Sequence, residues 1–218
     1  MRITSINVGL PREVVWKGQE VSTGIFKDPV TGPVEIGTLN LAGDAQADLT
    51  VHGGPDKAVY VYPTEHYDYW RRELPGVSLP WGKFGENFTV EGLAQGMPAA
   101  NGLAEDAVYI GDTFRIGSAI LMVTQPRMPC YKLGLKFRRD DIIKRFLLSG
   151  RSGFYLKVIA PGVASVGAEV VPLDRDPNLV TVADIGRLYL NKESHPDLLG
   201  RAMKVGALPQ AWKDWLPQ

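Results

Sequence analysis

The chain has a single cysteine, Cys130, in a segment whose residue types suit nucleophilic or metal-binding chemistry. The segment reads Gln125-Pro-Arg-Met-Pro-Cys-Tyr-Lys132 and follows an apolar run that predicts a buried strand. Its two prolines fix an extended backbone ahead of the thiol. Arg127 and Lys132 flank the cysteine, and nearby cations favour the thiolate, which is both the nucleophile and the metal ligand. The plain alternative is a cysteine that serves as a small buried apolar residue.

A polar, glycine-rich block over residues 43–57 is a second candidate for a site. Gly53 and Gly54 permit backbone conformations that turn successive N–H groups to one side, where they bind an anion such as phosphate. Lys57 would add a positive charge. A polar turn before a strand explains the same composition equally well. The other polar residues of the block are Asp44, Gln46, Asp48 and His52.

Two further features carry weaker expectations. The segment Ser149-Gly-Arg-Ser-Gly153 suits a phosphate or oxyanion, although a helix end and turn is the favoured interpretation. A nucleophile–base pair of Cys130 with His52 is a second hypothesis. His66 is expected on the surface or at an interface of a helix.

The amino-acid composition excludes several classes of site and partner. Lys and Arg total 24, as do Asp and Glu, so the zero net charge argues against a sequence-specific nucleic-acid partner. One cysteine excludes an internal disulfide, a CxxC pair and a cysteine-only iron–sulfur site. No apolar run approaches the roughly 20 residues of a membrane span. With no apolar leader at the N-terminus, we expect a cytoplasmic protein without a membrane partner.

Short apolar runs separated by glycine and proline predict a strand-rich body. A helix is expected over residues 63–74 and another over 139–148, because their apolar residues follow helical spacing. The expected strands cover residues 3–8, 14–27 as a hairpin, 33–41, 58–62, 85–90, 108–110, 114–116, 119–124, 154–160 and 167–172.

The character of the chain changes after Leu173. Residues 174–178 predict a linker, and Thr181 with Asp184 has the form of a capping box. Three short amphipathic helices follow. Strands followed by helices indicate an α+β protein, mainly β. We therefore predict a body over residues 1–173 and a three-helix appendage over 174–218. The pattern alone leaves a barrel and a sandwich open for the body.

Several separated motifs, in one order along the chain, resemble those of the MOSC-domain family and its YiiM-like branch. The resemblance implies a β-barrel body, peripheral helices and a molybdenum cofactor, a pterin dithiolene that carries a phosphate. It assigns the metal to Cys130. The motifs are residues 43–48 and 51–57, Phe84-Gly-Glu-Asn87, Ile110-Gly-Asp112, residues 124–133 and residues 149–155.

The same resemblance implies an oxidoreductase that reduces N-hydroxylated compounds, such as N-hydroxylaminopurines, and so detoxifies base analogues. A separate electron-donating reductase is the implied partner. The expected catalytic residues are Cys130, Asp48 and His52. The expected cofactor-binding residues are His52, Gly53, Gly54, Lys57, Asn87, Gln125, Arg127, Arg151 and Ser152.

Other interpretations stay open at this point. Cys130 could carry sulfur as a persulfide, or the protein could bind the cofactor without redox turnover of its own. A non-catalytic β module that recruits partners through its helices is a third interpretation. The helices could also join two copies into a homo-oligomer.

Overall fold

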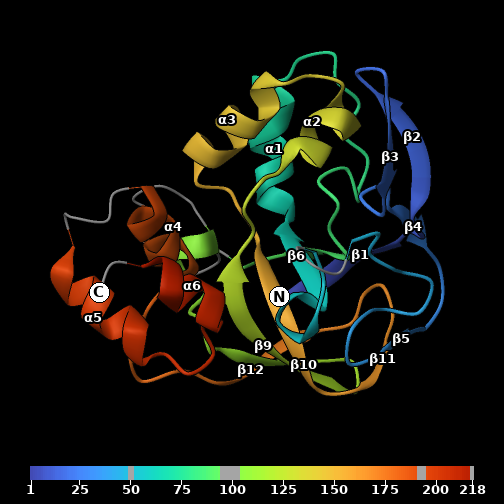
Figure 1. Cartoon of the computed structure of the whole chain (residues 1–218). Helices are drawn as coiled ribbons and strands as arrows, with labels where there is room; N and C mark the ends of the chain where they lie inside the picture. Colours follow the sequence, from blue (N-terminus) through green and yellow to red (C-terminus); the bar gives the residue numbers. More distant parts are fainter. Residues whose placement is uncertain (49–51, 94–103, 191–194, 217–218) are drawn as a thin grey trace.

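The fold is built around one eight-stranded sheet in the order β12-β8-β9-β10-β6-β7-β1-β4 (Figure 1). The computed structural model describes residues 1–48, 52–93, 104–190 and 195–216. The strands are β1 (Arg2–Val8), β2 (Arg12–Trp16), β3 (Gln19–Thr23), β4 (Asp28–Val30), β5 (Val34–Ile36), β6 (Val59–Pro63), β7 (Phe88–Glu91), β8 (Thr113–Ile116), β9 (Ala119–Pro126), β10 (Phe154–Ala160), β11 (Gly162–Ala164) and β12 (Val170–Asp174).

Six α-helices are present in the described residues. The helices are α1 (Thr64–Glu73), α2 (Tyr131–Phe137), α3 (Asp141–Ser149), α4 (Val182–Leu190), α5 (Pro196–Lys204) and α6 (Gln210–Trp215), with 3-10 turns η1 (Pro55–Lys57) and η2 (Ala104–Asp106). Helices α1 to α3 lie together beside one end of the sheet, and α4 to α6 gather on its flank (Figure 1). Thus the class is α+β and mainly β, as predicted.

Strand β6 separates two apolar cores, because all of its residues are buried. Side chains alternate across a strand. Val59 and Val61 therefore enter the larger cluster, which the sheet shares with the C-terminal helices. Tyr60 and Tyr62 enter a second, aromatic-rich cluster beneath α1, α2 and α3. The alternation puts Tyr60 on the side of the sheet where the candidate site lies.

The expected closed barrel is wrong. Among the described residues, the edge strands β12 and β4 do not pair, so the sheet stays open. The segment just before β12 approaches the start of β1, where Arg2 bridges Glu169 and the Ile3 N–H donates to the Ala168 carbonyl at 2.9 Å. The sheet does not close, because the later part of β1, from Ile6 to Val8, pairs with β4. That edge of β1 therefore cannot pair with β12.

Several predicted elements differ at their ends or in kind. The hairpin predicted through Lys17 and Gly18 is confirmed by the β2–β3 pairing. Residues 108–110 do not form a strand; Tyr109 makes only an isolated bridge to Thr181. Strand β9 continues to Pro126, past the predicted stop at residue 124. Helix α2 and the short strands β4 and β11 were not predicted.

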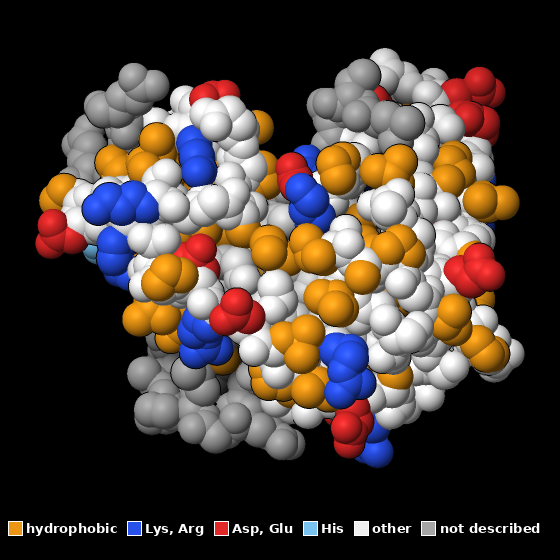
Figure 2. Space-filling model, turned by 90° about the horizontal axis from the view of Figure 1, so that it is seen from below, with side chains coloured by type: hydrophobic (Ala, Val, Ile, Leu, Met, Phe, Trp, Pro, Cys, Tyr) orange, Lys and Arg blue, Asp and Glu red, His pale blue; other side chains and the backbone are white. Residues whose placement is uncertain are grey.

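The C-terminal helices begin as predicted. The Thr181 N–H donates to Asp184 Oδ2, and the Asp184 N–H donates to Thr181 Oγ1, each at 3.0 Å. This reciprocal pair is a capping box with Asp in place of Glu. His195 is the residue that precedes α5. In the view from below, the helical part and the sheet body form two lobes with a broad contact (Figure 2). The division after residue 173 stays a prediction.

No helix among the described residues combines the length and apolarity needed to cross a bilayer.

Candidate active site

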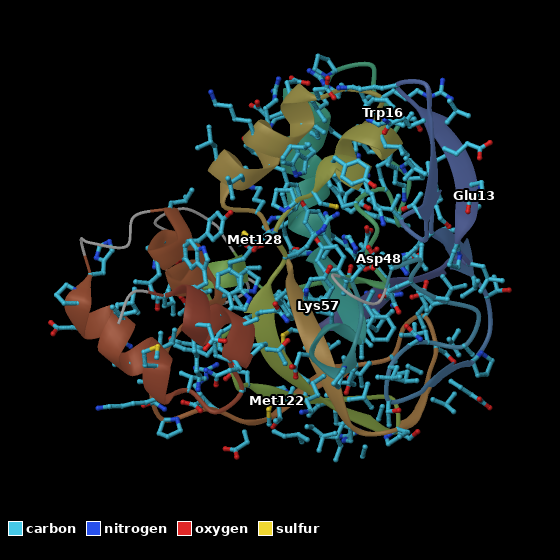
Figure 3. The ribbon with its side chains drawn as sticks, in the orientation of Figure 1. Glu13, Trp16, Asp48, Lys57, Met122 and Met128 are labelled. Carbon is cyan, nitrogen blue, oxygen red and sulfur yellow. The ribbon has the colours of Figure 1, made fainter. Side chains whose placement is uncertain are left out.

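Six of the residues predicted from the sequence line one cavity. It opens between the segment after β3, the loop before η1, and the neighbouring ends of β6, β9 and β10. In Figure 3 Asp48 and Lys57 lie on the segments that precede β6, and Met128 lies beyond the end of β9. The six predicted residues that line the cavity are His52, Gly53, Lys57, Asn87, Arg127 and Cys130.

Cys130 lies between β9 and α2 and caps the N-terminal end of that helix in an extended conformation. Its Sγ lies 3.5 Å from Nε2 of His52. Burial alone would raise the pKa of the thiol. The His52 hydrogen bond, the charge of Arg127 and the backbone N–H of Lys132 outweigh it and lower the pKa to about 7. A substantial fraction of Cys130 is therefore thiolate at neutral pH.

The guanidinium of Arg127 is buried beside this thiol, with only 6% of the residue exposed. It lies 5.1 Å from the ring centroid of Tyr60 and 5.3 Å from that of Phe146. Burial alone would lower its pKa, but Tyr60, Tyr155 and Cys130 raise it, so the cation stays charged. Its Nη1 has no hydrogen-bond partner among the described residues.

Positive charge dominates the cavity. Lys27, Lys57, Arg127 and Lys132 line it, and no Asp or Glu is among the described lining residues. Lys27 is neutralised by a buried ion pair with Asp44 behind the wall. The other three cations favour an anionic ligand.

Asn87 supports the wall from behind. Its Nδ2 donates to Asp44 Oδ2 at 2.9 Å, and its Oδ1 accepts from the Tyr60 N–H at 3.0 Å. The side chain thus links the carboxylate that holds Lys27 to strand β6. Its polar side-chain atoms are thus bonded within the protein, and its predicted part in cofactor binding stays a prediction.

Two glycines shape the loop before η1. Gly53 and Gly54 have φ values of 87° and 82°, a left-handed region that favours glycine. A Cβ at Gly53 would lie 2.9 Å from Gln46 Oε1. The His52 N–H donates to the Asp48 carbonyl at 2.9 Å, which holds the imidazole-bearing end of the loop. Residues 49–51 of the predicted block lie outside the described residues.

The structure places five other predicted residues outside the lining of this cavity. Gln125 donates to the Asp56 carbonyl at 3.2 Å and accepts from Trp212 Nε1 at 2.7 Å, so it connects η1 to α6. Arg151 stacks over Tyr69 at 3.9 Å. Those five are Asp48, Gly54, Gln125, Arg151 and Ser152.

Sequence reasoning missed several lining residues. Tyr60 and Tyr155 stand on strands that were predicted, so alternation along β6 could have indicated the first. Lys27 gave no signal, since its role depends on a fold contact with Asp44. His66 is a correction: it is buried, and its Nε2 lies 2.9 Å from both oxygens of Glu105.

The side chains that could ligate a metal limit which kind of metal group could bind here. Among the described residues, no group of three or more His, Cys, Asp or Glu could hold a metal ion. A metal beside Cys130 would therefore take most of its ligands from a cofactor. One soft thiolate and three cations without a lining carboxylate among the described residues fit a metal cofactor that carries negative charge.

The comparisons with known proteins agree with this geometry. The MOSC domain model matches residues 48–171, more than half of the chain. The chain belongs to the MOSC-domain family. YflK of Bacillus subtilis is 37% identical over 211 residues, which is 97% of this chain and 90% of that protein. YiiM of Escherichia coli is 37% identical over 192 residues, which is 87% of this chain and 81% of YiiM.

Solved structures of this MOSC branch share the fold. The crystal structure of YiiM from Geobacillus stearothermophilus superposes with a TM-score of 0.78 at 32% identity, over 99% of this chain and 96% of that chain. A Gibberella moniliformis protein named "Reductase" is 28% identical over 191 residues. The matched region is 86% of this chain and 32% of that protein. The chain is thus a YiiM-like MOSC protein.

Proposed function

We propose that this protein binds a molybdenum cofactor and reduces N-hydroxylated compounds such as N-hydroxylaminopurines, which would detoxify base analogues. The observation that carries the proposal is the Cys130 thiol, 3.5 Å from His52 Nε2, in a cavity lined by cations and by no carboxylate among the described residues. Membership of the MOSC-domain family and the relative named "Reductase" support an oxidoreductase.

The residues of the cavity divide into a metal ligand and an anion cradle. The Cys130 thiolate would ligate molybdenum, for which soft sulfur donors are suited. Lys57 and Lys132, together with Arg127, would neutralise the phosphate and the other negative charge of the cofactor. The absence of a side chain at Gly53 lets the loop backbone pack closely against Gln46, because a Cβ there would collide with the Gln46 side chain. When bound, the cofactor would supply the two-electron chemistry.

The chain's own contribution to turnover is binding, orientation and proton supply. In the reduction the N–O bond breaks, an N–H bond forms and water leaves, which consumes two electrons and two protons. The electrons would come from a separate reductase. His52 is the proton donor we assign, since its imidazole lines the cavity within 3.5 Å of Sγ. Asp48 holds the loop of His52 through its carbonyl, so we assign it a positioning role.

The test is reduction of 6-N-hydroxylaminopurine by protein made in a cofactor-producing host, with a chemical reductant in place of the unknown donor. The wild type should form adenine and Cys130→Ser should not. Lys213→Met, at a half-buried position of α6 that does not line the Cys130 cavity, is the control and should keep wild-type activity. Absence of adenine from a wild type that contains stoichiometric molybdenum would contradict the proposed substrate class.

A further inference from the structure

A second cavity shares one lining residue, Arg127, with the Cys130 cavity. Its walls are the Pro126–Pro129 segment, helix α3 with the turn after it, and helix α4 of the C-terminal part. Its volume is about 180 Å³. Cys130 and His52 are not among its described lining residues, so it is distinct from the proposed reaction site.

Arg127 contacts an aromatic ring of each cavity. Its guanidinium lies 5.1 Å from the ring centroid of Tyr60, which lines the Cys130 cavity, and 5.3 Å from that of Phe146, which lines the second cavity. Arg127 itself lines both. One of its nitrogens, Nη1, is buried and has no hydrogen-bond partner among the described residues. A buried donor without a partner is uncommon in folded proteins, and an acceptor on a ligand would satisfy it.

The walls of the second cavity otherwise select an apolar ligand. Phe146, Leu147, Val182 and Leu190 present apolar side chains, and Met128 adds a thioether that suits an aromatic ring. The charged residues that line it are both arginines. The second one, Arg187, is already paired with Asp106 and Asp184. Among the described residues, Arg127 is therefore the charged side chain of this cavity for which no carboxylate partner is seen.

The volume of the second cavity limits the size of the ligand that it can hold. An engineered cavity of roughly 150 Å³ lined by Leu, Ile and Phe holds one benzene. A cavity of about 180 Å³ therefore has room for one six-membered ring and a small substituent. We propose that the second cavity binds a monocyclic aromatic carboxylate, with the ring between α3 and α4 and the carboxylate on the Arg127 guanidinium.

Two helical glycines allow a matched test of this site. Gly186 in α4 lines the cavity, and a Cβ added there meets nothing within 4 Å. Gly200 in α5 also has nothing within 4 Å of an added Cβ, but it does not line the cavity. Leucine is a better helix former than glycine, so both replacements suit their helices. Gly186→Leu would fill the cavity, and Gly200→Leu is its control.

The experiment is isothermal titration of benzoate into the full chain, purified without cofactor, in saturating inorganic phosphate that occupies the cationic Cys130 cavity. The wild type and Gly200→Leu should bind one benzoate with the same Kd, and Gly186→Leu should bind it at least about tenfold more weakly. Equal Kd values in Gly186→Leu and the wild type, or no binding by a folded wild type at millimolar benzoate, would overturn the proposal.

A second measurement tests the role assigned to Arg127. Arg127→Gln should lose most of the benzoate affinity but keep toluene binding, measured by ligand-observed NMR, because toluene needs only the ring pocket. Equal losses of toluene and benzoate in a folded Arg127→Gln protein would contradict the carboxylate contact. Gly186→Leu should also lose toluene binding. This measurement depends neither on an Arg127 variant nor on catalytic activity.

Discussion

His52 and Cys130, separated by 78 positions in the chain, are brought to a distance of 3.5 Å between Nε2 and Sγ. The loop before η1 supplies the imidazole, and the segment after β9 supplies the thiol. Because this hydrogen bond favours the thiolate, the pair keeps a substantial thiolate fraction at neutral pH.

Removal of the imidazole should make the thiol less acidic. In cofactor-free protein the rate of Cys130 alkylation by iodoacetamide should rise with pH around a midpoint of about 7. In His52→Ala the midpoint should move upward, because the thiolate loses its hydrogen-bond donor while burial still opposes its charge. His195→Ala, at the start of α5, should behave as the wild type. An unchanged midpoint in His52→Ala would contradict the role given to this contact.

Asn87 should matter for stability rather than for charge. Asn87→Ala leaves the Tyr60 N–H and the buried Asp44 carboxylate short of a partner. The free energy of unfolding should fall by about 1–3 kcal/mol, measured by urea denaturation. Asn178→Ala, at a half-buried turn, should cost less. A smaller loss for Asn87→Ala than for Asn178→Ala would contradict the supporting role.

The capping box at α4 predicts a modest and coupled loss. Thr181→Ala should lower the free energy of unfolding by about 1 kcal/mol, since it removes the acceptor for the Asp184 N–H. Because the two bonds are reciprocal, Thr181→Ala with Asp184→Ala should cost less than the sum of the single changes. Thr38→Ala, at an exposed turn, is the control. Strict additivity would indicate that the two bonds act separately.

Lys136 predicts a pH dependence of stability. Burial lowers its pKa to about 7 from an ordinary value of 10.5, although Glu86 opposes this shift. Between these two values the unfolded chain holds a proton that the folded chain has released. The stabilising contribution is therefore present above pH 10.5 and is lost as the pH falls to 7. The wild type should gain stability relative to Lys136→Gln between pH 7 and 10. A constant difference across this range would refute the shift.

The sequence indicated much of the fold because local signals and packing agree. Buried runs such as Ala58 to Tyr62 and the hairpin turn at Lys17 and Gly18 carry their structure in residue type alone. The open sheet could not be predicted this way, since it depends on which partner takes each side of β1. Helix α2 was missed because it follows directly on the Pro129–Cys130 segment, where the prolines indicated extended chain.

For the site, sequence alone reached the residues whose types are unusual. Cys130, Arg127 and His52 were singled out by chemistry and by resemblance, and the fold brings them together. Arg151 suited an anion equally well by type, but it stacks on Tyr69 instead. Gln125 stands beside Pro126 in the predicted segment, yet its side chain faces Asp56 and Trp212. Side-chain direction at the end of a strand is set by tertiary contacts that a single sequence does not show.

The most direct test of the central claim is the molybdenum and pterin content of protein made in a cofactor-producing host, for the wild type beside Cys130→Ser. Metal analysis and pterin fluorescence on the same samples give the two contents. The account predicts near-stoichiometric molybdenum and pterin in the wild type, and loss of molybdenum from a folded Cys130→Ser protein. Absence of both from a folded wild type would contradict the account, and a sulfur atom released from Cys130 by reductant would then favour a persulfide carrier.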